Sequence, residues 1–193
     1  GQIHGNIFGG GLGESGQDNA SKGQVNGTVI VNIGATDGQQ TPAYTGNATL
    51  YGSVYGCNNT NGSPQGNVTV NIYSTAHTTT DAVGYTADDG TNGAPTYAIA
   101  NVFGGGRQAD YTPSSDQSRA TVYIHGCSNT IEDLFGGGDA AAAYGVVTIV
   151  EGGRFHRIFG GGNGENVPAD IGAGGTDLQV HGGNIGQLFG GSN

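Results

Sequence analysis

Thr-Ile-Val-Glu-Gly-Gly-Arg-Phe-His-Arg-Ile-Phe-Gly-Gly-Gly, residues 148–162, contains the two features that decide the fold. It opens with a short β-branched run and closes with an aromatic residue followed by glycines. The closing phrase, with some variation, recurs along the whole chain of 193 residues. Its aromatic positions are Phe8, Tyr55, Phe103, Phe135, Phe159 and Phe189. A phrase that returns at the same place in each unit indicates a repeat architecture, in which the recurring residues do the packing.

The repeat unit is short and reads as strands. From Phe135 to Phe159 it spans 24 residues, too few for a four-stranded propeller blade. An apolar run precedes most copies of the phrase, and in one of them Val68, Val70 and Ile72 alternate with polar residues. Such alternation of β-branched residues is typical of β-strands. Equivalent strands recurring in one direction predict an all-β parallel β-helix, a solenoid of about five coils with rungs ~4.8 Å apart.

The first glycine of the phrase never varies. It is Gly9, Gly56, Gly104, Gly136, Gly160 and Gly190. A position restricted to glycine predicts either a positive φ or a crowded corner. The third position accepts Asn58, which suggests a left-handed residue there and a mild effect of Gly138→Asn. A phosphate-binding reading fails because no helix pattern and no Gly-Lys-Ser/Thr follows any copy.

Composition excludes several classes of protein. The net charge is −10 with five basic residues, which argues against nucleic acid and anionic membranes as partners. No apolar stretch approaches the ~20 residues of a membrane span, so we expect no direct membrane insertion. Cys57 and Cys127 fall about two rungs apart, roughly 10 Å along the axis, which is too far for a disulfide.

We interpret residues 1–193 as one solenoid segment, an excerpt of a longer repetitive chain. Solenoids need polar caps, and neither end has one, so we expect adjacent repeats or subunits to cover the ends. Long loops interrupt the units, and loops on a rigid scaffold commonly carry binding. These insertions span residues 12–27, 34–46, 73–97, 107–119 and 163–177.

The 24-residue interval aligns two charged pairs on adjacent rungs. It sets Glu132 beside His156 and Asp133 beside Arg157. We expect an exposed surface ladder, in which each pair contributes only ~0.2–1 kcal/mol. The functional alternative is a carboxylate acting as a catalytic acid on a bound sugar, as in polysaccharide lyases and hydrolases.

No cofactor is expected. The segments 10–15 and 161–166 approach a calcium-binding repeat but lack its aspartate, so structural calcium remains only an alternative. His125, Glu151 and His181 fall in one column on three successive rungs. The outer two backbones would lie about 10 Å apart, so a solvated ladder is favoured over a zinc site.

Residues 148–164 and 178–191 resemble the Gly-Gly-x-Ile-x-x-Val-Phe-Gly-Gly-Gly-Asn repeats of very large adhesin-like surface proteins of anaerobic, gut-type bacteria. The resemblance implies a single-stranded right-handed parallel β-helix, displayed extracellularly or on the bacterial cell surface. It also implies a non-catalytic structural or adhesion module, with glycans or surface proteins of host or bacteria as partners. The alternative is a carbohydrate-active or glycan-binding module that works in a groove made by the insertions.

Overall fold

The computed structural model describes residues 2–16, 21–36, 44–45, 49–50, 52–75, 85–86, 96–126 and 129–193. Most of the insertions 34–46 and 73–97, and also Cys127, lie outside these residues. The described chain forms strands and no helix. In particular, no described segment makes a helix long and apolar enough to cross a membrane.

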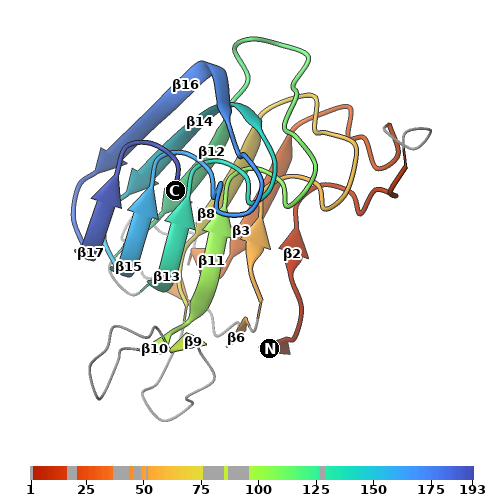
Figure 1. The fold of residues 1–193 in the computed structure, drawn as a ribbon. Coiled ribbons are helices and arrows are strands. Elements are labelled where there is room, and N and C mark those ends of the chain that lie inside the picture. The colour runs from red at the N-terminus through yellow and green to blue at the C-terminus, as the bar shows by residue number, and fades with distance from the viewer. Residues whose placement is uncertain are drawn as a thin grey trace.

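Two parallel sheets make up the molecule. The first has the order β17-β15-β13-β11-β7-β2 and the second the order β16-β14-β12-β8-β3. Strands of the first sheet are β2 (Ile7–Phe8), β7 (Val54–Tyr55), β11 (Ile99–Phe103), β13 (Thr130–Phe135), β15 (Arg154–Phe159) and β17 (Asn184–Phe189). Strands of the second are β3 (Val29–Ile33), β8 (Val68–Ile72), β12 (Ala120–Ile124), β14 (Ala143–Val150) and β16 (Ile171–Val180). Figure 1 shows the two layers one behind the other.

Three two-stranded pairs lie outside these sheets. Strand β1 (Gln2–Ile3) runs parallel to β6 (Thr49–Leu50). Strands β4 (Ala35–Thr36) and β5 (Tyr44–Thr45) are antiparallel, as are β9 (Tyr85–Thr86) and β10 (Thr96–Tyr97). All of these short strands except β1, which precedes β2, belong to the connections between the main strands.

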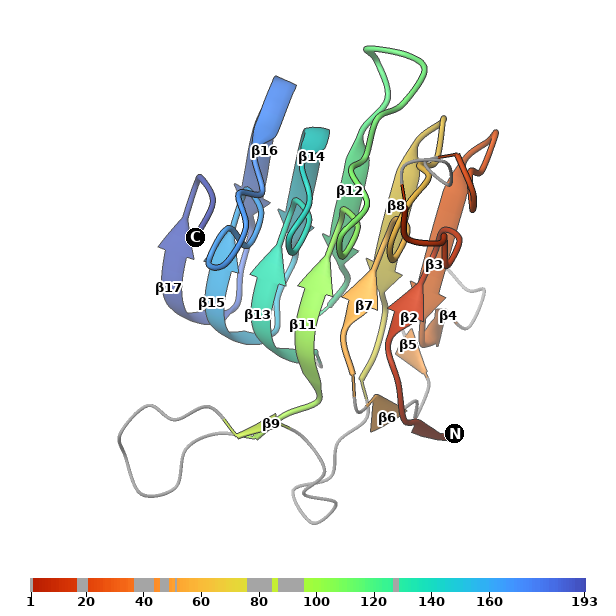
Figure 2. The same ribbon diagram turned by 45° about the vertical axis from the view of Figure 1, so that its right-hand side comes forward.

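The prediction of a single-stranded right-handed parallel β-helix of about five coils is wrong. The structure has two separate parallel sheets of six and five strands and no closed solenoid among the described residues. Each repeat unit contributes one main strand to each sheet, so successive main strands alternate between the layers (Figure 2). Insertions of unequal length connect the two layers.

The main core lies between the two sheets. One wall is the alternating run Val68, Val70 and Ile72 with its equivalents in the other strands, and the facing wall includes Ile131 and Leu134. All five of these side chains are fully buried. Period-two alternation in the second sheet therefore places its apolar residues inward, as the sequence pattern indicates.

The aromatic residues of the repeat phrase form a second cluster on the other face of the first sheet. Phe135 follows the inward-facing Leu134, so its ring points away from the main core. The six rings of the phrase stack with centroids 4.8–4.9 Å apart and planes within 10° of parallel. One aromatic column thus runs the full width of the sheet, with the rung spacing expected from the sequence.

The residue after each aromatic of the phrase is glycine because the two sheets come close together at this position. A Cβ on Gly9 would lie 2.6 Å from Val29 Cγ1 and 2.4 Å from the Gly56 carbonyl oxygen. Gly56, Gly104 and Gly136 meet equivalent obstacles from the next rung. None of these first glycines has a positive φ, so crowding rather than backbone conformation excludes a side chain.

Candidate functional site

The charged ladder of the first sheet consists of Glu132, Asp133, His156 and Arg157, and its two carboxylates are buried while its two basic side chains are about one third exposed. Backbone pairing sets Asp133 opposite Arg157, as the 24-residue interval predicted. Arg157 donates to both carboxylate oxygens of Asp133, at 2.9 and 2.5 Å. Glu132 and Asp133 are 7% and 6% exposed, whereas we expected them on the surface. The bidentate geometry makes this pair a brace between β13 and β15.

Glu132 has a raised pKa. Its pKa is raised to about 7, chiefly by burial and also by the neighbouring Asp133 carboxylate, while Arg157 opposes the shift. Ile131 pairs with Phe155 and Asp133 with Arg157, so Glu132 lies beside His156 on the neighbouring strand. His156, however, turns its Nδ1 toward Asp133 Oδ1, at 3.8 Å, beyond hydrogen-bond range. The four residues therefore meet, and none of them lines either of the two hollows described below.

Neutral polar residues continue this row toward the N-terminal edge. Asn101 pairs with Asp133 in the ladder and donates from Nδ2 to Ser53 Oγ at 3.2 Å. The Ser53 backbone amide in turn donates to Asn6 Oδ1 at 2.9 Å. The row thus ties neighbouring strands together and leaves its charged groups engaged with one another.

The column His125, Glu151 and His181 does not form a set of metal ligands. Glu151 accepts a hydrogen bond from the Tyr123 hydroxyl at 2.8 Å and pairs with His181 Nδ1 at 3.2 Å. His125 instead stacks on Tyr73 and Tyr123. Within the described residues, no group of three or more His, Cys, Asp or Glu side chains is placed to hold a metal ion.

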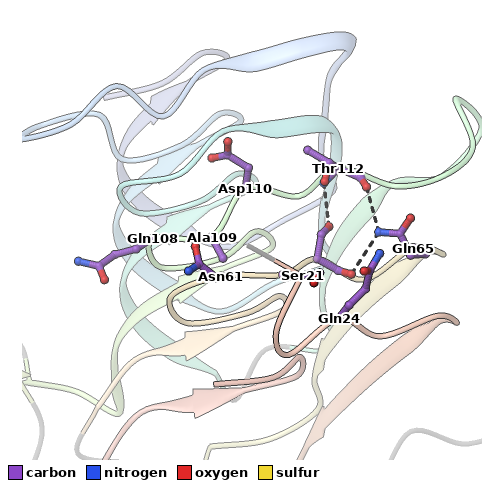
Figure 3. Close-up of a pocket in the computed structure, with 10 residues that line it drawn as sticks. Ser21, Gln24, Asn61, Gln65, Gln108, Ala109, Asp110 and Thr112 are labelled. Carbon is purple, nitrogen blue, oxygen red and sulfur yellow. Dashed lines mark hydrogen bonds between the residues drawn. The ribbon is translucent and has the colours of Figure 1, made fainter. Parts of the chain in front are cut away.

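A hollow of about 430 Å³ lies at the corner where loops follow the glycine phrases. Its lining comes from three segments far apart in sequence: the insertion 12–27, the turn after β7 and the insertion 107–119. They contribute Ser21, Gln24, Asn61, Gly62, Ser63, Gln65, Gln108, Ala109, Asp110 and Thr112. Figure 3 shows Gln108 at one end of this group and Gln65 at the other.

The floor of this hollow is held by hydrogen bonds between loops. The Thr112 amide donates to Ser63 Oγ at 2.8 Å, and Gln65 Nε2 donates to the Thr112 carbonyl at 3.3 Å (Figure 3). Asp110 Oδ1 accepts from the Ala142 amide at 2.8 Å. These bonds tie the insertion 107–119 to the turn after β7 and to the segment that precedes β14.

A second hollow of about 270 Å³ adjoins the first and shares Asp110 and Thr112 with it. Its remaining lining is more apolar and includes Pro113 and Tyr144. Tyr111 also lines it but is buried, and its hydroxyl donates to the Gly66 carbonyl at 2.9 Å. Tyr111 therefore packs its loop against the scaffold.

Asn58 connects this corner to the strands, and sequence reasoning misjudged its role. The residue is fully buried and does not adopt a positive φ. Its Oδ1 accepts from the Gly11 amide at 3.0 Å, and its Nδ2 donates to the carbonyls of Gly23 and Asn61 at 2.8 Å. Asparagine replaces glycine here because its amide joins its own loop to the connection between β2 and β3. The one sequence signal for this role was the presence of an uncharged polar residue at a position that is glycine in most copies of the phrase.

Comparisons with protein-family models, with curated proteins and with solved structures found no match for this chain.

Proposed function

We propose that the chain is a non-catalytic structural and adhesion module of an extracellular, cell-surface bacterial protein. In this role the two sheets form a rigid scaffold that presents loops at one corner. The observation that carries the proposal is the unbroken aromatic column, whose ring spacing stays at 4.8–4.9 Å across all six strands of the first sheet. Such regularity suits a structural element that is extended by repetition.

The exposed edge of the scaffold supports an end-to-end partner. Leu188 and Phe189 on β17 are 50% and 42% exposed, whereas the equivalent Leu134 and Phe135 are 0% and 2% exposed. Strand β2, at the opposite edge, carries the same phrase at Ile7 and Phe8. A further unit of the same repeat, from this chain or another, would pair with β17 and cover these side chains.

The charged ladder supports a non-catalytic reading. Asp133 is buried and engaged by Arg157 through two hydrogen bonds. A general acid or a nucleophile must reach its substrate, and Asp133 lines neither of the two hollows at the loop corner. The pair instead resembles a buried brace, whose function is to fix two strands.

A tandem protein tests the end-to-end arrangement. Two copies joined by a flexible Gly/Ser linker of about 20 residues have the reach for β2 of the second copy to pair with β17 of the first. We expect the tandem to unfold in one transition at a higher temperature than the single copy, because neighbouring units stabilise each other. Leu188→Lys in the first copy should uncouple them. The exposed loop substitution Leu12→Lys, in the same copy, is the matched control. Two independent transitions at the single-copy temperature would overturn the proposal.

Incubation with polysaccharides tests the non-catalytic part. We expect no release of reducing ends or of unsaturated products from a panel of neutral and acidic polysaccharides. Turnover that Asp133→Asn or Glu132→Gln abolishes in a folded protein would contradict it.

A further inference from the structure

We propose that the paired hollows at the loop corner bind a neutral oligosaccharide, with one sugar unit in each hollow. This inference rests on the proposed role of the corner as the presenting surface. At about 430 Å³ the larger hollow falls within the ~300–1,000 Å³ range of small-ligand pockets. The smaller one, at about 270 Å³, lies beside it and shares the lining residues Asp110 and Thr112.

The hydrogen-bonding groups of the larger hollow match a polyol. Its polar side chains are hydroxyls and carboxamides together with the Asp110 carboxylate. Hydroxyls and carboxamides both donate and accept, as sugar hydroxyls do. Among the described residues, the side-chain amides of Gln24 and Gln108 have no hydrogen-bond partner, so they are available to a ligand.

Asp110 stands at the junction of the two hollows. Its Oδ1 accepts from the Ala142 amide, which fixes the carboxylate and leaves Oδ2 for a ligand. A carboxylate accepts hydrogen bonds from neutral hydroxyls strongly. It repels an anionic sugar, and no Lys or Arg lines either hollow to offset that repulsion. With a net charge of −10, the chain selects against uronates and sulfated glycans.

The second hollow supplies an apolar wall. Pro113 and Tyr144 line it beside Asp110, and Arg119 lies over the Tyr144 ring at 5.7 Å, which helps to hold the ring in place. The C–H face of a pyranose suits such a wall, while its hydroxyls face Asp110 and Thr112.

Titration calorimetry with defined probes tests the proposal. The probes are neutral β-1,4-linked hexasaccharides of glucose, mannose and xylose, a galacturonate hexasaccharide, and a pool of unstructured hexapeptides. We expect saturable binding of at least one neutral hexasaccharide and of neither other class. Gln108→Ala and Asp110→Asn should each weaken that binding by about tenfold, since Asp110→Asn keeps the acceptor for the Ala142 amide but removes the charge.

Gln117→Ala is the matched control, because Gln117 is exposed in the same insertion but does not line either hollow. Its binding should equal that of the unmodified protein. Failure of every neutral probe, preference for the uronate or the peptides, or unchanged affinity of the folded Gln108→Ala and Asp110→Asn variants would each overturn the proposal. Coupled unfolding of the tandem protein does not depend on this site, so its result separates the two proposals.

Discussion

At the scale of single residues, the first glycine of the phrase has no room for a side chain in the interior of the sheet. A Cβ on Gly136 would lie 2.3 Å from the Gly160 carbonyl oxygen and 2.6 Å from Thr148 Oγ1. We expect Gly136→Ala to prevent folding or to lower the free energy of unfolding by ~3 kcal/mol or more. Gly190 occupies the same phrase position at the open edge, where a Cβ meets nothing within 4 Å. Thermal melts should therefore show Gly190→Ala unchanged, and an equal loss in both variants would contradict the crowding argument.

The third glycine is also crowded, which reverses the sequence expectation for Gly138→Asn. A Cβ there would lie 2.5 Å from the Ala141 carbonyl oxygen. Asn58 is tolerated at the equivalent place because its own loops are arranged around its amide. The substitution at Gly138 is therefore costly rather than mild.

Glu132 should make stability depend on pH. Its folded pKa of about 7 exceeds the ordinary value of 4.5, so the folded state keeps the proton to higher pH than the unfolded state. The resulting stabilisation is complete below pH 4.5 and is lost as pH rises through 7. We expect Glu132→Gln to raise the free energy of unfolding at pH 8 by about 1 to 2 kcal/mol and to flatten this pH dependence.

Urea denaturation at pH 5 and pH 8 measures the effect. Glu165→Gln is the control, because Glu165 is exposed. A Glu132→Gln variant that keeps the full pH dependence of the unmodified protein would show that another group titrates.

Asp133 should matter more than an exposed ion pair. Its loss leaves the Arg157 guanidinium, whose side chain is 33% exposed, without its main partner. We expect Asp133→Asn to cost about 2 kcal/mol, and a double-mutant cycle with Arg157→Gln to recover part of this loss. The exposed pair Lys22 and Glu14 should give under ~0.5 kcal/mol in the same cycle. Equal coupling energies in the two cycles would show that the Asp133–Arg157 pair stabilises the protein no more than an exposed ion pair, as the sequence suggested.

At the scale of elements, the aromatic column joins all six strands of the first sheet. Phe135 is 2% exposed between two stacked rings, whereas Phe189 at the edge stacks on one ring and is 42% exposed. We expect Phe135→Ala to cost ~3–5 kcal/mol and Phe189→Ala less than half as much. Denaturant titration of both variants measures the difference, and similar losses would mean that stacking within the column contributes little.

At the scale of the whole molecule, Gly190 links stability to assembly. In the interior, each first glycine faces the carbonyl oxygen of the equivalent glycine on the next rung. A unit stacked on β17 would bring its own Gly9 carbonyl to Gly190. We therefore expect Gly190→Ala, silent in the single copy, to uncouple the two halves of the tandem protein when placed in the first copy. A tandem carrying Gly190→Ala that still melts in one raised transition would rule out this mode of contact.

The sequence alone determined the register. The repeat phrase and the 24-residue interval are local properties, so they located the strands, the aromatic column and the pairing of Asp133 with Arg157. Period-two alternation also identified the inward residues of the second sheet, because side-chain direction in a strand follows position alone.

Only the tertiary structure decided how the units close and what lies buried. Two sheets form in place of one continuous coil because the path between strands depends on irregular insertions, whose packing no periodicity encodes. Glu132 is buried for a similar reason, since its exposure depends on neighbours distant in sequence. The corner hollows combine residues near 21, 61 and 110, so they exist only once stacking has brought three separate loops together.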